Sequence, residues 1–166
     1  MKRWLVALLL VTAGVVGCKK GGQANDDGAK EVLTAFVKPG ADHAALTAAL
    51  RPKPEDYEAV FVGDAAQKVK AALEPVWEGG KAVLKPQPDQ TEVVVGGASP
   101  DQLAKGEGNA DLCPKGYKDI ADKLKTTVYC GRFVKPGDKL GMAIDGLVNV
   151  NGHWAIFPKA FRVLSK

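Results

Sequence analysis

Apolar residues recur three and four positions apart through much of the first half of the chain, a spacing that is typical of amphipathic helices. The longest such pattern follows Asp64. Its apolar face consists of Ala65, Ala66, Val69, Ala72, Leu73, Val76 and Trp77. Gly79 and Gly80 should end this helix, and Pro75 predicts a kink or an early end because proline cannot donate a backbone hydrogen bond.

Three shorter helices are expected before it. Residues 31–37 predict the first. Asp42 is typical of a residue that caps a helix N-terminus, here that of a second helix running through Leu50. Pro54 suits the first position of a third helix, where its missing N–H would have no partner in any case. The side chains that this third segment should bury are Tyr57, Val60 and Phe61.

The middle of the chain predicts two short strands and two further helices. The strands are residues 81–85 and 91–95, separated by a proline-rich turn. Ser99, followed by a proline and then by Gln102, has the pattern of a capping box at the start of a helix. After a loop at 106–111, residues 114–124 predict another helix. This helix should bury Tyr117, Ile120, Ala121 and Leu124.

Strands dominate the last forty residues, which predict an antiparallel sheet. Residues 126–134 and 140–150 are the expected strands, and Asn151-Gly152 is the strongest hairpin signal in the chain. With that turn, Val150 opposes His153, Asn149 opposes Trp154, Val148 opposes Ala155, Leu147 opposes Ile156 and Gly146 opposes Phe157. One face of the long strand would carry Leu140, Met142, Ile144, Gly146, Val148 and Val150. Asp145-Gly146 is a rival turn that would split this strand and change the facing pairs.

These elements indicate an α+β fold, with N-terminal helices packed on a C-terminal curved antiparallel sheet that ends in the Asn-Gly hairpin. Residues 29–166 would form one globular domain. Helices followed by a curved sheet with a final Asn-Gly-x-Trp hairpin resemble cystatin-like and nuclear-transport-factor-like folds, over residues 126–164. The resemblance implies a sheet wrapped on one or more helices and leaves the function open, because such folds host enzymes, binders and scaffolds.

The chain begins with a positive start, Met1-Lys2-Arg3, and continues with an uncharged, almost wholly apolar run from Trp4 to Val16. A helix of that length rises about 20 Å, less than the ~30 Å of a bilayer hydrocarbon core. Residues 1–17 are therefore predicted to be a signal peptide. The alternative is a short membrane anchor that stays attached.

Val15-Val16-Gly17-Cys18 resembles the lipobox of bacterial lipoproteins. The resemblance implies cleavage before Cys18 and diacylation of its sulfur, often followed by acylation of the new amino terminus, and two or more chains anchor a protein stably. In lipoproteins of enteric-type bacteria an Asp after the cysteine favours retention in the inner membrane, so Lys19 at that position implies the outer membrane facing the periplasm. Residues 18–28 are polar and glycine-rich, so they should form a flexible tether between lipid and domain.

Removal of residues 1–17 takes away Lys2 and Arg3 and lowers the formal net charge from +4 to +2, which indicates no nucleic-acid surface. Export also places Cys113 and Cys130 in an oxidising compartment. The two are expected to form a disulfide, worth about 3 kcal/mol in the chain-entropy model. The alternative is two free buried thiols.

Candidate chemistry is sparse. The chain has two serines and two histidines, and it contains no Gly-x-Ser-x-Gly, no His-Glu-x-x-His and no glycine-rich phosphate loop. No cofactor and no metal site is expected. The best polar candidates lie around the last hairpin, where a ligand pocket would be formed by Asp145, Asn149, His153, Trp154 and Phe157. If Asp145 is buried, its pKa should rise.

Because anchoring matters only where position matters, the leading hypothesis is a membrane-anchored envelope lipoprotein with a non-enzymatic binding domain. Its partner would be another envelope protein or a small apolar ligand. The alternative is a small hydrolase or isomerase, with Asp145 or His153 as the acid–base residue in a sheet-lined cavity. A third hypothesis is an accessory subunit of an envelope assembly, with the sheet edge as its interface.

Overall fold

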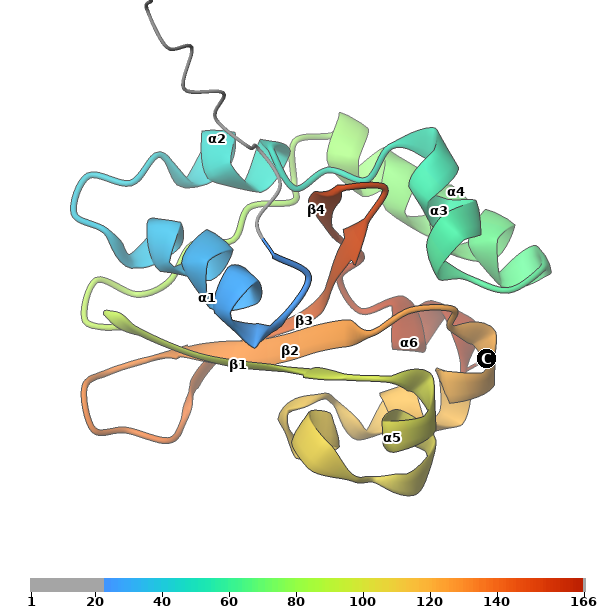
Figure 1. Cartoon of the computed structure of the whole chain (residues 1–166). Coiled ribbons are helices and arrows are strands. Elements are labelled where there is room, and N and C mark those ends of the chain that lie inside the picture. Colours follow the sequence, from blue (N-terminus) through green and yellow to red (C-terminus); the bar gives the residue numbers. More distant parts are fainter. Residues whose placement is uncertain (1–22, 166) are drawn as a thin grey trace, which may run out of the picture.

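An antiparallel sheet of four strands, in the order β1-β2-β3-β4, lies in the C-terminal part of the chain, and most of the helices precede it (Figure 1). The computed structural model describes residues 23–165. The expected α+β class is confirmed, and the sheet does not close into a barrel. The strands are β1 (Glu92–Ala98), β2 (Val128–Val134), β3 (Gly141–Val150) and β4 (His153–Ile156). The predicted signal peptide, Cys18 and the first part of the expected tether lie outside the described residues.

Helices lie on both sides of the sheet. In Figure 1, α1 and α2 lie above it, α5 lies below it, and α3, α4 and α6 gather toward the β3–β4 side. The α-helices are α1 (Asp26–Thr34), α2 (His43–Ala48), α3 (Pro54–Val60), α4 (Asp64–Glu78), α5 (Pro100–Lys105) and α6 (Ala160–Leu164). Shorter 3-10 helices are η1 (Ala35–Val37), η2 (Gly108–Leu112) and η3 (Lys115–Lys123).

The first helix begins earlier than expected, at Asp26, within the segment predicted to be tether. Asn25 caps it, because its side chain accepts a hydrogen bond from the N–H of Gly28 at 2.9 Å. Asp26 in turn accepts a hydrogen bond at 2.8 Å from the N–H of Gly97 in β1. The polar residues that suggested a linker therefore cap the helix and attach it to the sheet.

The next three helices follow their sequence signals. Asp42 caps α2 through the N–H of Ala45 at 3.0 Å, and α3 begins at Pro54. Helix α4 continues through Pro75 to Glu78, so the expected early end does not occur. Pro75 is exposed and lies in the last turn, and its carbonyl accepts the N–H of Gly79 at 3.1 Å. The helix therefore resumes its hydrogen bonding directly after the proline.

Two expected elements differ in kind. Residues 81–85, predicted as a strand, have no regular structure, and the N–H of Leu84 donates to the hydroxyl of Thr47 at 3.0 Å instead of to a neighbouring strand. Residues 115–123, predicted as an α-helix, form the 3-10 helix η3. The residues expected to be buried there are buried, namely Tyr117, Ile120, Ala121 and Leu124.

The Asn-Gly hairpin is confirmed. Asn151 and Gly152 have φ angles of 49° and 76°, the two positive values that a type I′ turn requires. The observed partners are Val150 with His153, Asn149 with Trp154, Val148 with Ala155 and Leu147 with Ile156, as predicted. Gly146 is held to Phe157 by one backbone hydrogen bond of 2.8 Å, beyond the last strand pair.

The rival signal, Asp145-Gly146, forms a bulge within β3 and not a turn. Tyr129 pairs with Leu147 and Gly131 pairs with Ile144, so β3 has one more residue than β2 between these pairs. An extra residue inverts the alternation of side chains. The prediction of one continuous apolar face from Leu140 to Val150 is therefore wrong, and Leu140 itself is 80% exposed.

The bulge gives the sheet two apolar faces. Met142, Ile144 and Leu147 share a face with Phe133, whose ring lies 6.0 Å from that of Phe36 in η1. Val148 and Val150, beyond the bulge, point to the other face with Val128 and Cys130. On this second face Cys113, between η2 and η3, forms a disulfide with Cys130 at an S–S distance of 2.02 Å, as expected.

Candidate functional site

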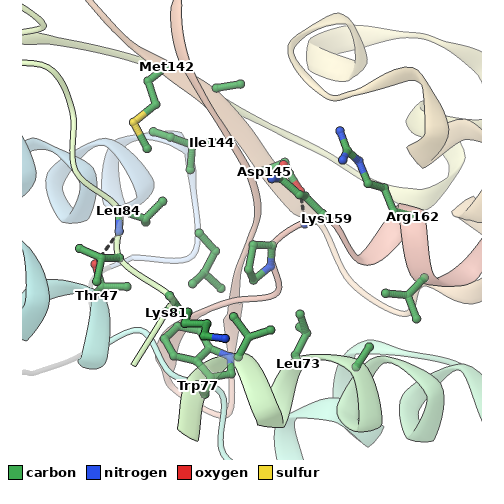
Figure 2. Close-up of a pocket in the computed structure, with 18 residues that line it drawn as sticks. Thr47, Leu73, Trp77, Lys81, Leu84, Met142, Ile144, Asp145, Lys159 and Arg162 are labelled. Atoms are coloured by element: carbon green, nitrogen blue, oxygen red, sulfur yellow. Dashed lines mark hydrogen bonds between the residues drawn. The ribbon is translucent and has the colours of Figure 1, made fainter. Parts of the chain in front are cut away.

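A half-open groove of about 500 Å³ lies beside β3 (Figure 2). Its walls come from the end of α4, the irregular segment after it, β3, and the chain from the end of β4 into α6. We call this cavity the groove. It is lined by Thr47, Ala72, Leu73, Val76, Trp77, Lys81, Ala82, Val83, Leu84, Met142, Ala143, Ile144, Asp145, Ile156, Pro158, Lys159, Arg162 and Val163. Its volume is within the ~300–1,000 Å³ of small-molecule sites.

Thr47 holds one wall of the groove in place. Its side chain is 1% exposed, and its hydroxyl donates to the carbonyl of His43 at 2.6 Å while accepting the N–H of Leu84 at 3.0 Å. This fixes the irregular segment against α2, opposite Met142 and Ile144 of β3. Residues 81–84 of this irregular segment line the groove.

A second buried contact shapes the other end. Asp145 Oδ1 accepts a hydrogen bond from the Tyr117 hydroxyl at 3.0 Å and another from the N–H of Lys159 at 2.7 Å. Lys159 has a φ of 56°, which is unusual for a residue with a side chain and costs of order 1–3 kcal/mol. The hydrogen bond to Asp145 stabilises this conformation at the point where the chain turns from β4 into α6.

Burial and charge act in opposite directions on Asp145. Loss of hydration raises the pKa of its carboxyl, as expected from the sequence, while its two hydrogen bonds and the nearby charges of Lys159 and Arg162 lower it. Burial is the largest of these effects. Desolvation, together with the charge and the hydrogen bond of the Asp145 carboxylate, raises the pKa of the fully buried Tyr117 hydroxyl well above its usual value.

The groove is apolar with a positive end. Thirteen of its eighteen lining residues are apolar, and the charged ones are three cations and one carboxylate. Figure 2 shows Asp145, Lys159 and Arg162 together at one end, with Met142 and Leu84 away from them. Neither Lys159 nor Arg162 forms an ion pair with another residue of the described chain. Both side chains are exposed, and the guanidinium carbon of Arg162 lies 5.7 Å from the centroid of the Phe161 ring.

Trp77 contributes the largest apolar surface to the groove. It is 8% exposed, and its Nε1–H has no hydrogen-bond partner within residues 23–165. An unpaired buried N–H costs about 1–3 kcal/mol.

A separate buried carboxylate, Asp56, holds the hairpin tip. It is 0% exposed and accepts the N–H of Lys53 at 2.7 Å and the side-chain amide of Asn151 at 2.8 Å. His153 Nε2 lies 2.9 Å from the same carboxylate. These contacts attach the β3–β4 turn to the start of α3, away from the groove.

The five residues predicted to share a pocket therefore do not converge. Asp145 alone lines the groove. His153 is bound to Asp56, and Trp154 packs against Tyr129 with ring centroids 5.0 Å apart. Phe157 packs edge-on against Tyr57 and Phe61. Asn149 lies opposite Trp154 in the hairpin.

Sequence reasoning missed most of the groove. Trp77 and Leu73 fit the core-facing stripe of α4, which gives no sign of a cavity beyond its end. Lys81, Lys159 and Arg162 are ordinary surface residues in the sequence.

Nowhere in residues 23–165 do three or more His, Cys, Asp or Glu side chains gather in a way that could hold a metal ion. None of the helices in that range has the length and hydropathy needed to cross a bilayer.

Comparison of the chain with protein-family models, with curated proteins and with solved structures finds no match.

Proposed function

We propose that this protein is a membrane-anchored envelope lipoprotein whose domain binds a small apolar ligand in the groove without transforming it. The groove carries the proposal, because an open cavity with thirteen apolar lining residues exposes surface to water that a ligand would cover. The anchor is supported by the lipobox resemblance at residues 15–18, and Lys19 favours the outer membrane facing the periplasm.

Anchoring and binding complement each other in this proposal. A tethered protein meets ligands that are present in or near the membrane, and apolar molecules concentrate there. The sequence between Cys18 and the Asn25 cap is short, so the groove would remain within a few nanometres of the bilayer surface.

The experiment is native mass spectrometry of the protein isolated from membranes, with and without reductant. Chain 18–166 plus acyl groups, gaining two hydrogens on reduction and releasing a bound apolar molecule on activation, supports the proposal. A mass that retains residues 1–17 without acyl groups removes the lipoprotein assignment. A correctly lipidated chain that never carries or takes up an apolar molecule removes the binding function.

One observation favours the alternative function, a small hydrolase or isomerase. Asp145 lines the groove and has a raised carboxyl pKa, as an acid–base residue would. Both of its hydrogen bonds, however, serve structural groups, Tyr117 and the backbone of Lys159. Turnover of any substrate that is abolished by Asp145→Asn, with folding intact, would replace the binding proposal.

A further inference from the structure

We infer that the groove takes a single-chain anionic amphiphile, such as a fatty-acid carboxylate, with its head at Lys159 and Arg162 and its tail along Trp77 and Ile144. This inference rests on the proposed function, because it names the class of ligand for the same site.

The charge distribution selects an anionic head. Near Asp145 the groove is lined by two cations, Lys159 and Arg162, against that one carboxylate, whereas the third lining cation, Lys81, lies beside Trp77 (Figure 2). Lys159 and Arg162 are exposed, and neither forms an ion pair with another described residue. Both lie close enough to Asp145 to lower the pKa of its carboxyl. The two cations therefore converge on one end of the groove and exceed the negative charge there.

The backbone that carries one of these cations is held at this end of the groove. The Lys159 N–H donates to Asp145 at 2.7 Å and holds the residue in a left-handed conformation, at the entry to α6. Arg162 follows three residues later, on the same side of the first helical turn. Figure 2 shows both beside Asp145 at one end of the cavity. A carboxylate head placed there would reach both charges at once.

The rest of the groove suits a tail. Away from Asp145, the cavity passes Leu73 and Trp77 of α4 on one side and Met142 and Ile144 of β3 on the other (Figure 2). Burying an acyl chain there contributes about 0.8 kcal/mol per CH₂ group. A volume of about 500 Å³, in the lower part of the range for ligand sites, is suited to one chain.

The inference is tested by photocrosslinking in membranes that contain the full chain. The probe is a fatty acid with a diazirine in its chain, and the matched control probe is the alcohol of the same chain. The acid should label peptides covering 72–84 and 142–144, about fivefold more than the alcohol does, as expected for a few exposed ion pairs. Excess palmitate should compete with this labelling.

Charge variants separate recognition of the head from apolar binding. Lys159→Asn combined with Arg162→Gln should reduce acid labelling about fivefold, to the level of the alcohol. Asparagine tolerates the left-handed backbone at position 159. Asp145→Asn keeps the acceptor for Tyr117 and removes the one negative charge, so acid labelling should rise about threefold and alcohol labelling should not change.

A size variant tests the location. Ala72 lines the groove and is exposed, so Ala72→Phe should block labelling by both probes without disturbing the core. Ala71, its exposed neighbour on α4, does not line the groove, and Ala71→Phe is the matched control that should label normally. Thermal unfolding of each variant verifies that it is folded.

Three outcomes would overturn the inference. Equal labelling of the groove by acid and alcohol would refute recognition of the head and leave the apolar binding function standing. Labelling outside the groove, unaffected by Ala72→Phe, would refute both. Stronger labelling in a Cys18→Ser variant would show that the chain's own acyl groups occupy the groove, in place of an external amphiphile.

Discussion

Replacement of Asp145 by alanine should destabilise the domain severely, although the residue lies at the edge of a groove and not in the core. The change removes the acceptor for two donors, the Tyr117 hydroxyl at 3.0 Å and the Lys159 N–H at 2.7 Å. The hydroxyl is fully buried and would be left unpaired, at a cost of about 1–3 kcal/mol. Loss of the bond that supports the strained Lys159 adds about 1 kcal/mol, which gives a total of about 2–4 kcal/mol.

The assay is thermal unfolding at neutral pH, followed by circular dichroism. A loss of that size corresponds to a fall in Tm of about 4–16 °C for a domain of this length. Asp145→Asn is the matched control, because its amide oxygen still accepts both hydrogen bonds. In the Asp145→Ala background, Tyr117→Phe should cost less than it does alone, since the orphaned hydroxyl is already without an acceptor.

The pH dependence adds a second readout. Because burial raises the pKa of the folded carboxyl, the folded state binds this proton more tightly than the unfolded state does. The contribution of Asp145 to the free energy of unfolding is therefore greatest at a pH below the pKa of the carboxyl in the unfolded chain, near 3.9. It is lost as the pH rises through the higher pKa of the folded state. The Asp145→Asn variant should have the same free energy of unfolding as the wild type near pH 4, and it should be more stable than the wild type at pH 7. An alanine variant as stable as the wild type, or an asparagine variant as unstable as alanine, would refute this reasoning.

Three further changes test other contacts. Gly146→Ala places a Cβ 2.1 Å from the Phe157 carbonyl oxygen at a φ of 77°, so it should lower the free energy of unfolding, measured in urea, by at least ~3 kcal/mol. The control Gly137→Ala, with a φ of 81° and open space around the new Cβ, should lower it by about 1 kcal/mol. Equal losses of stability in the two variants would contradict the close approach at Gly146. Reduction of Cys113–Cys130 should lower stability by about 3 kcal/mol, and an unchanged Tm under reductant would show that the cross-link adds nothing. Asp56→Ala leaves the Lys53 N–H and the Asn151 amide without their acceptor, so it should lower the free energy of unfolding by about 3 kcal/mol and speed amide hydrogen exchange at residues 151–153. Unchanged exchange there would show that Asp56 does not hold the hairpin tip.

Much of the local structure could be predicted from the sequence, because short-range chemistry specifies it. A cap such as Asp42 or Ser99 bonds to an N–H only three residues away. Asn151-Gly152 adopts a turn that few other residue pairs tolerate, and the turn then sets four strand pairs. Helical spacing after Asp64 determines which face of α4 is buried.

The prediction failed where distant residues decide the local state. The segment 81–85 has strand-like residues, but Leu84 bonds to Thr47 and leaves no strand pair. Asp145-Gly146 forms a bulge because β2 continues beside it and Lys159 and Tyr117 bond to its carboxylate. A turn signal alone does not reveal whether a neighbouring strand will keep pairing across it.

The sequence by itself determined the fold class, the helix caps, the hairpin and the pairing of Cys113 with Cys130, because each depends on composition or on contacts close along the chain. Only the tertiary structure decided where a cavity lies. The groove brings α4, β3 and α6 together across a bulge and an irregular segment, and its walls are separated by up to about a hundred residues. Sequence patterns identify the residues that avoid water, whereas a cavity exists only where packed elements fail to fill the space between them.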